Sequence, residues 1–123
     1  MQLKTFLLIA LTTVTASASA ISLDTRAAAD FGQCTPTMDF KFGRPGRKAT
    51  EGTFLPTDPL VAKGQEDALN PNIITKRICD QLTNVCDANQ AAKDLCATAE
   101  AQVEALGTKD ASTADAFNSA LGF

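Results

Sequence analysis

The segment from Ile78 to Cys96, ICDQLTNVCDANQAAKDLC, decides the fold, because it contains three of the four cysteines in this chain of 123 residues. The fourth, Cys34, lies far upstream. Zinc sites favour Cys or His pairs at short spacing, and thioredoxin-like redox sites need a Cys-x-x-Cys motif. The chain has no histidine and no such motif. The even number of cysteines therefore predicts two disulfides, provided that the chain is exported to an oxidising compartment.

The first residues, MQLKTFLLIALTTVTASASA, have the pattern of a secretory signal peptide. Lys4 gives a positive start, Phe6 to Val14 form an apolar run, and Ala18-Ser19-Ala20 supplies the small residues that signal peptidase recognises. A membrane anchor is the alternative. A spanning helix needs about 20 apolar residues, however, and threonines interrupt this run early. We therefore predict that the chain is secreted.

The expected organisation is a signal peptide at 1–20, a flexible arm or short pro-segment at 21–33, and a single small disulfide-bonded domain at 34–123. About 100 residues are enough for one domain with a modest core. Without Lys4 the chain has ten basic and fourteen acidic residues, so its charge does not predict nucleic acid as a partner. No later segment is apolar enough to predict a membrane span. The predicted location is extracellular or associated with the cell wall.

The residues around the cysteines have helical periodicity. Asn70-Pro71 is a typical helix start, and a first helix is predicted from about Pro71 to Val85. Its apolar residues recur every three or four positions, at Ile74, Ile78, Leu82 and Val85.

Two further helices are predicted in the C-terminal part. Asp87-Ala88-Asn89 has the composition of a turn, and the second helix follows it to Leu106, where Gly107 ends it. The third helix extends from Asp110 to Leu121, with Ser112 as its cap.

The N-terminal part of the domain has strand-like periodicity. Met38, Phe40 and Phe42 alternate with Asp39 and Lys41, which predicts a short strand. A second short strand at 53–55 follows the loop GRPGRKATEG, as in a loose β-hairpin, and Asp58-Pro59 then predicts one capped helical turn that ends at Gly64. The predicted fold is therefore mainly α: a disulfide-stapled helical hairpin and a third helix, with a short N-terminal strand-like segment.

Helix geometry ranks the three ways of pairing four cysteines. If Cys79 and Cys86 share one helix, their seven-residue separation corresponds to about 10 Å of rise, whereas bonded cysteines have Cα atoms within about 7 Å. Across a turn at 87–89, Cys79 and Cys96 lie level with each other. We therefore predict Cys79–Cys96 and Cys34–Cys86. The alternative is Cys34–Cys79 with Cys86–Cys96.

Catalytic equipment is not recognisable. Without histidine, a Ser-His or Cys-His nucleophile pair is unavailable. Two of the carboxylates could act as an acid and base pair, although none stands in a signature: Glu51 and Asp58, which flank the second strand, and the adjacent Glu66 and Asp67. Phosphate-binding and calcium-binding loop motifs are also missing. The sequence predicts a protein that is not an enzyme and that uses no cofactor or metal.

The most suggestive local feature is a basic cluster on and beside the predicted loop, made of Lys41, Arg44, Arg47 and Lys48. In an otherwise acidic chain it could bind anions, such as acidic polysaccharide, phospholipid headgroups or a partner protein. The alternative, a solvated turn without a ligand, is the favoured interpretation.

The segment DPLVAKGQEDALNPNIITKRICDQLTNVCDANQAAKDLC resembles a group of small, four-cysteine secreted proteins of filamentous fungi. The shared features are a Cys-Thr-Pro opening, a Phe-rich strand region, an ALNP–I–C–L–C block and an alanine-rich C-terminal half, over about residues 33–121. The resemblance implies a fungal extracellular or wall-associated protein. The group has no assigned catalytic residues, so no site residue is carried over.

Together these features predict a secreted, non-enzymatic binding or effector-like protein, whose partner is an extracellular protein or a cell-wall polysaccharide. One alternative is a structural cell-wall or surface-coating protein. A second is a small antimicrobial or toxin-like protein, although the acidic balance of the chain does not favour it.

Overall fold

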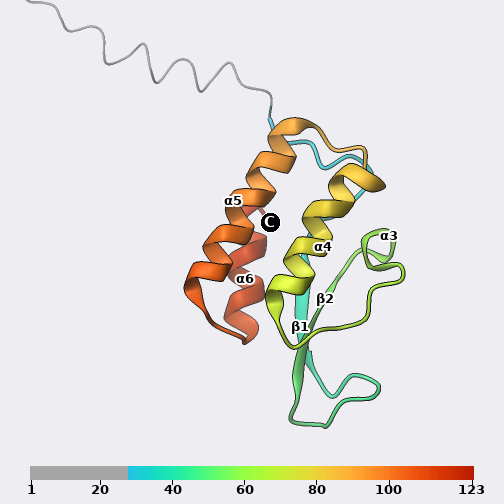
Figure 1. The fold of residues 1–123 in the computed structure, drawn as a ribbon, viewed down its shortest axis with the longest axis vertical. Coiled ribbons are helices and arrows are strands. Elements are labelled where there is room, and N and C mark those ends of the chain that lie inside the picture. Colours follow the sequence, from blue (N-terminus) through green and yellow to red (C-terminus); the bar gives the residue numbers. More distant parts are fainter. Residues whose placement is uncertain (1–27) are drawn as a thin grey trace, which may run out of the picture.

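The computed structural model describes residues 28–123 (Figure 1). The predicted signal peptide and residues 21–27 of the predicted arm lie outside the described residues. The described part has four helices and one two-stranded antiparallel sheet, so the mainly helical class is confirmed. Its elements are β1 (Met38–Phe42), β2 (Gly52–Pro56), α3 (Pro59–Ala62), α4 (Pro71–Asn84), α5 (Gln90–Leu106) and α6 (Ala111–Ala120).

The two long helices begin and end at residues with clear chemical reasons. The side chain of Asn70 accepts a hydrogen bond from the N–H of Asn72 at the start of α4, and Pro71 occupies the first helical position. Asn89 caps α5 in the same way, and Gly107 ends it in the left-handed conformation that glycine adopts without steric cost. These two helices lie side by side and antiparallel (Figure 1).

The start of α6 differs from the sequence interpretation. Asp110, and not Ser112, is its N-cap: the Asp110 carboxylate accepts from the N–H of Ser112, and the Thr113 hydroxyl accepts from the N–H of Asp110. This reciprocal capping box satisfies two otherwise unpaired donors. Ser112 lies two residues too late to cap the helix, because its own N–H is one of the groups that needs capping.

The hairpin of β1 and β2 pairs Phe40 with Phe54 and Phe42 with Gly52. The ring of Phe40 packs over Gly52, since a Cβ atom built there would lie 2.1 Å from this ring and would force it to move. The ring of Phe40 also contacts that of Phe54, with centroids 4.9 Å apart. The hairpin extends beyond the helices at one end of the molecule (Figure 1).

One core joins the sheet to the helices. It includes Met38 and Phe54 from the hairpin and Phe117 from α6. The contribution of α5 consists mostly of small residues, namely Ala92, Cys96, Ala99 and Val103. Small side chains allow close helix approach but bury little apolar area per turn, so the α4–α5 pair needs a further source of stability.

Two disulfides supply this additional stability. Cys79 and Cys96 join α4 to α5 with Cα atoms 5.6 Å apart, and Cys34 and Cys86 join the N-terminal segment to the turn after α4 with Cα atoms 5.3 Å apart. These are the pairs that the helix geometry predicts. One premise needs correction, because α4 ends at Asn84 and Cys86 therefore lies just beyond the helix, with its N–H bonded to the carbonyl of Gln81.

Part of the predicted flexible arm is fixed on the domain. The Asn89 side chain donates to Ala28 O (2.8 Å) and accepts from Asp30 N–H (3.0 Å), while Asn89 N–H donates to Asp30 O (2.9 Å). Gly32 has φ of +65°, and a Cβ there would lie 1.9 Å from Cys86 O. The ordered domain therefore includes residues 28–33. The composition of the segment did not reveal this, because the partner is a distant helix cap.

Removing either disulfide should destabilise the domain by several kcal/mol. The Cys79–Cys96 bridge closes a separation of 17 residues and the Cys34–Cys86 bridge one of 52. Loop entropy predicts losses of about 3 and about 4 kcal/mol for the Cys79→Ser/Cys96→Ser and Cys34→Ser/Cys86→Ser variants. Urea unfolding of the three proteins measures both values. A double variant as stable as the parent chain would contradict a structural role for that bridge.

The Lys76-Arg77 dibasic pair should resist proteases while the disulfides are intact. Arg77 lies within α4, and its guanidinium donates to the carbonyls of Val61 (3.1 Å) and Lys63 (2.5 Å). Cleavage requires an extended backbone, which this helix does not offer. Limited trypsin digestion should cut first after Lys48, in the exposed hairpin loop, and after Arg77 only when reductant is added. Early cleavage after Arg77 in the oxidised protein would contradict this.

Candidate binding surface

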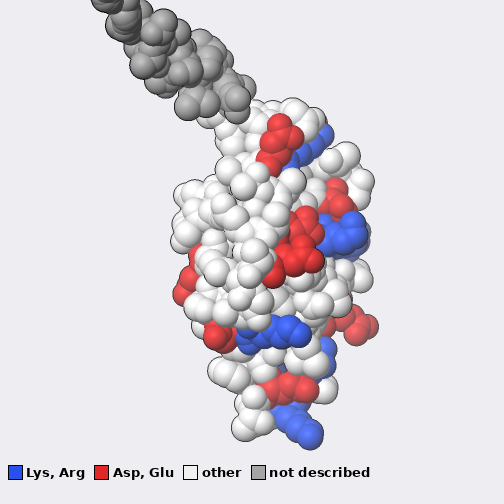
Figure 2. Space-filling model, turned by 60° about the vertical axis from the view of Figure 1, so that its left-hand side comes forward, with Lys and Arg blue, Asp and Glu red and all other residues white. Residues whose placement is uncertain are grey.

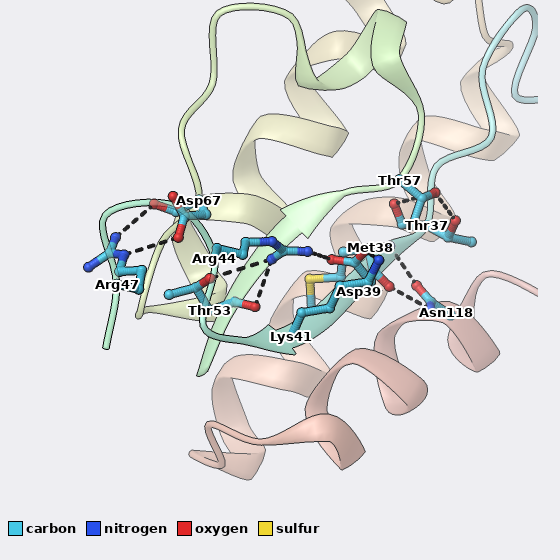
Figure 3. Close-up of polar contacts among 10 residues, drawn as sticks. All are labelled: Thr37, Met38, Asp39, Lys41, Arg44, Arg47, Thr53, Thr57, Asp67 and Asn118. Atoms are coloured by element: carbon cyan, nitrogen blue, oxygen red, sulfur yellow. Dashed lines mark hydrogen bonds and ion pairs between the residues drawn. The ribbon is translucent and has the colours of Figure 1, made fainter. Parts of the chain in front are cut away.

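Arg44 links the two strands of the hairpin. Its guanidinium donates to the carbonyl oxygen of Thr53 on β2 (3.0 Å) and forms an ion pair with Asp39 on β1 (Figure 3). The Arg44 side chain is only 12% exposed. Charge-assisted bonds to both strands hold the loop start against the sheet, so this arginine has a structural role and is not available to a soluble anion.

Arg47 fastens the far side of the same loop. Its Nε donates to an Asp67 carboxylate oxygen (3.0 Å) and its Nη2 to the Asp67 carbonyl oxygen (3.1 Å) (Figure 3). Its Nη1 also lies 4.0 Å from a carboxylate oxygen of Glu51. A hydrogen bond from the buried Thr53 hydroxyl, together with the Arg47 guanidinium, holds the pKa of Asp67 below its ordinary value of 3.8. The loop is thereby tied to the chain that leads into α4.

The predicted basic cluster is therefore largely neutralised. Lys41 lies 3.7 Å from Asp39, which it shares with Arg44, and no ion pair of Lys48 is present in the described part of the chain. Four cations thus face three carboxylates, which leaves one net positive charge. Figure 2 shows acidic and basic groups interspersed over the face it draws. The sequence could not reveal this, because Asp67 is distant from the loop along the chain.

The outer edge of β1 is the most distinctive feature of the hairpin. Gly43 N–H donates to Glu51 O (3.1 Å) and Thr57 N–H donates to Thr37 O (3.0 Å), so the odd-numbered residues direct their main-chain groups towards β2. Because these groups alternate along a strand, those of Met38, Phe40 and Phe42 point to the opposite edge.

Asn118 of α6 occupies one end of this edge. Its side-chain amide donates to Met38 O (2.9 Å) and accepts from Met38 N–H (3.0 Å), as a neighbouring strand would (Figure 3). For Phe40 and Phe42, the hydrogen bonds of residues 28–123 include none to the outward main-chain groups. The edge is therefore closed at Met38 and open beyond it.

The side chains around the open edge are apolar on one face and charged on the other. Phe42 is 63% exposed and packs edge-on against Phe40, with ring centroids 5.1 Å apart. Lys41 points to the opposite face and its side chain is 66% exposed. A large exposed aromatic beside unpaired main-chain groups is typical of an interaction surface.

Of the other carboxylates that the sequence offered as an acid and base pair, Glu66 has an exposed side chain, whereas Asp58 has structural partners. Asp58 caps α3 through the N–H of Leu60 (2.9 Å) and also accepts from Thr35 N–H (2.8 Å). Within residues 28–123, no group of three or more acidic, histidine or cysteine residues could hold a metal ion. No helix of this part is both long and apolar enough to cross a bilayer.

The fold and this surface define a small, disulfide-stapled, mainly helical domain that carries a braced β-hairpin. No protein family, no curated protein and no solved structure matches the chain. The surface must therefore be interpreted from its own chemistry. Sequence reasoning found the hairpin and its cations but missed Asn118, whose position on α6 gives no signal of a contact with β1.

The Asp67→Asn variant tests the contact between Arg47 and Asp67 through the pH dependence of stability. A carboxylate with a lowered pKa stabilises the folded state above its unfolded pKa, and this stabilisation is lost as the pH falls through the folded pKa. We expect the variant to lose at most about 1 kcal/mol of unfolding free energy at neutral pH, because solvent screens part of the interaction, and the difference should shrink as the pH falls below the ordinary pKa of the carboxyl group. Urea unfolding at neutral and at acidic pH measures this.

The control is Glu66→Gln, which removes an adjacent exposed carboxylate and should have little effect at either pH. A loss in Asp67→Asn that persists at low pH would show that the charge of Asp67 is not what stabilises the loop.

Proposed function

We propose that this chain is a secreted, non-enzymatic binding protein that recognises an extracellular protein through its β-hairpin. The observation that carries the proposal is the open edge of β1 beside the exposed Phe42. Arg44 and Arg47 fix the loop, and the disulfides fix the helices beneath it, so little conformational entropy is lost when a partner binds.

Three further features support an extracellular role. Two disulfides in a small domain are typical of proteins that fold in an oxidising compartment. The predicted signal peptide and the resemblance to fungal secreted proteins agree with this and remain predictions. On this proposal the chain acts by contact with a partner and carries out no chemistry of its own.

A surface-coating or wall-bound role is the second candidate, and a separate observation favours it. Several large apolar side chains besides Phe42 are exposed: Leu60, Leu69, Ile73, Leu106 and Phe123. Adsorption through such residues would be spread over the surface and would not depend on any one of them.

Affinity capture separates the two candidates. The oxidised full-length secreted protein is immobilised and exposed to an apoplastic protein extract and, separately, to washed wall polysaccharide. We expect a saturable protein ligand whose retention falls at least about tenfold for Phe42→Ala, as for an aromatic at the centre of an interface. The matched control is Leu106→Ala, which removes a similarly exposed apolar side chain (54%) at the end of α5.

Equal losses for both variants, or retention on the polysaccharide alone, would favour the coating role. Capture of neither fraction would contradict the proposed function.

A further inference from the structure

We infer that the open edge of β1 binds an extended peptide segment of a partner protein as an added strand, with an acidic residue of the peptide placed between two apolar ones. This inference rests on the proposed function and names the chemistry of the partner. It follows from three properties of the edge: its free main-chain groups, its alternating side chains and its closed end.

The main-chain groups set the binding mode. Phe40 and Phe42 present two N–H and two C=O groups outward, and Asn118 already satisfies the equivalent groups of Met38. The side-chain amide of Asn118 bonds to both outward main-chain groups of Met38, so this end of the edge already accepts a partner in the geometry of strand pairing. A peptide that continues the pairing from Phe40 to Phe42 would satisfy the remaining groups.

The side chains set the sequence of the peptide. Phe40 and Phe42 share one face of the sheet and form an aromatic pair, so residues opposite them should be apolar. Lys41 faces the other way, and its neighbour Asp39 is already paired with the nearly buried Arg44. This face has one net positive charge, and an acidic residue across from Lys41 complements it.

A second copy of this chain fits the edge poorly. Two β1 strands that pair antiparallel through Phe40 and Phe42 place Lys41 directly opposite Lys41 of the second copy, and like charges at such positions are destabilising. Centring the pair on Phe40 would require Met38, whose outward groups are held by Asn118. The edge therefore favours a different chain.

The test uses the oxidised full-length protein and short capped peptides in which glutamate stands between two valines. Addition of the peptide should shift the amide resonances of Phe40 and Phe42 and slow their hydrogen exchange, with little change at α4 or α5. Unchanged exchange at these two amides, or absence of binding, would overturn the inference.

Methylation of peptide nitrogens identifies strand pairing directly. The N–H groups of an extended peptide point alternately towards and away from β1. Methylation of the set that faces β1 should abolish binding, whereas methylation of the other set should leave it within about twofold. Equal effects of the two sets would indicate adsorption of apolar side chains and would overturn strand addition.

Charge reversal tests the peptide sequence. The Lys41→Glu variant should bind the glutamate peptide about fivefold to tenfold more weakly, and should prefer a peptide in which lysine replaces glutamate. The control Lys48→Glu makes the same charge change in the exposed loop and should keep the preference for glutamate. If both variants lose the preference for the glutamate peptide equally, the loop as a whole attracts the peptide. This result would contradict the placement of the glutamate opposite Lys41.

The two proposals fail in distinguishable ways. Capture of a protein partner that depends on Phe42, without any peptide binding at the edge, would keep the proposed function and overturn strand addition. Peptide binding at the edge without capture of a protein would support strand addition and contradict the proposal that the partner is an extracellular protein.

Discussion

The structure depends on the covalent link between α4 and α5. The buried residues of α5 are mostly small, so the two helices approach closely while burying little apolar area, and short helices are marginal alone. Cys79 and Cys96 lie level across the pair and fix its register. Once this register is set, Asn89 and Cys86 at the turn are positioned to receive the N-terminal segment, through hydrogen bonds to residues 28–30 and through the bridge to Cys34.

That second attachment explains how a short hairpin stays folded. A two-stranded sheet is marginal by itself, and here its first strand begins only four residues after Cys34. The hairpin is held on one side by the disulfide, on another by the bridge between Phe54 and Ala68, and at its edge by Asn118. The buried side chains of Met38 and Phe54 then connect it to the core beneath α4 and α6.

Local chemistry made much of this predictable from the sequence. Groups within a few residues determine the elements that begin or end at Asn70-Pro71 and Gly107, and the strand from Met38 to Phe42. Fixed helix rise favours the observed pairing because it places Cys79 and Cys96 level across the turn. The errors share a different cause. The position of residues 28–33, the neutralisation of Arg47 by Asp67 and the clamp of Asn118 on Met38 all join residues that are distant in sequence. No local pattern encodes such contacts, so residues 28–33 looked flexible and the carboxylate partner of Arg47 was not recognised.

The clamp by Asn118 has a consequence for specificity. An edge strand that is open over its whole length is a template for aggregation, because any extended chain can pair with it in several registers. By satisfying Met38, Asn118 shortens the open part of β1 to Phe40–Phe42, and Lys41 in its centre opposes pairing with a second copy. Few hydrogen bonds then remain to provide affinity, so the side chains of a partner must contribute most of the selectivity. A short edge with a charged centre and one closed end therefore offers a second copy few registers for pairing.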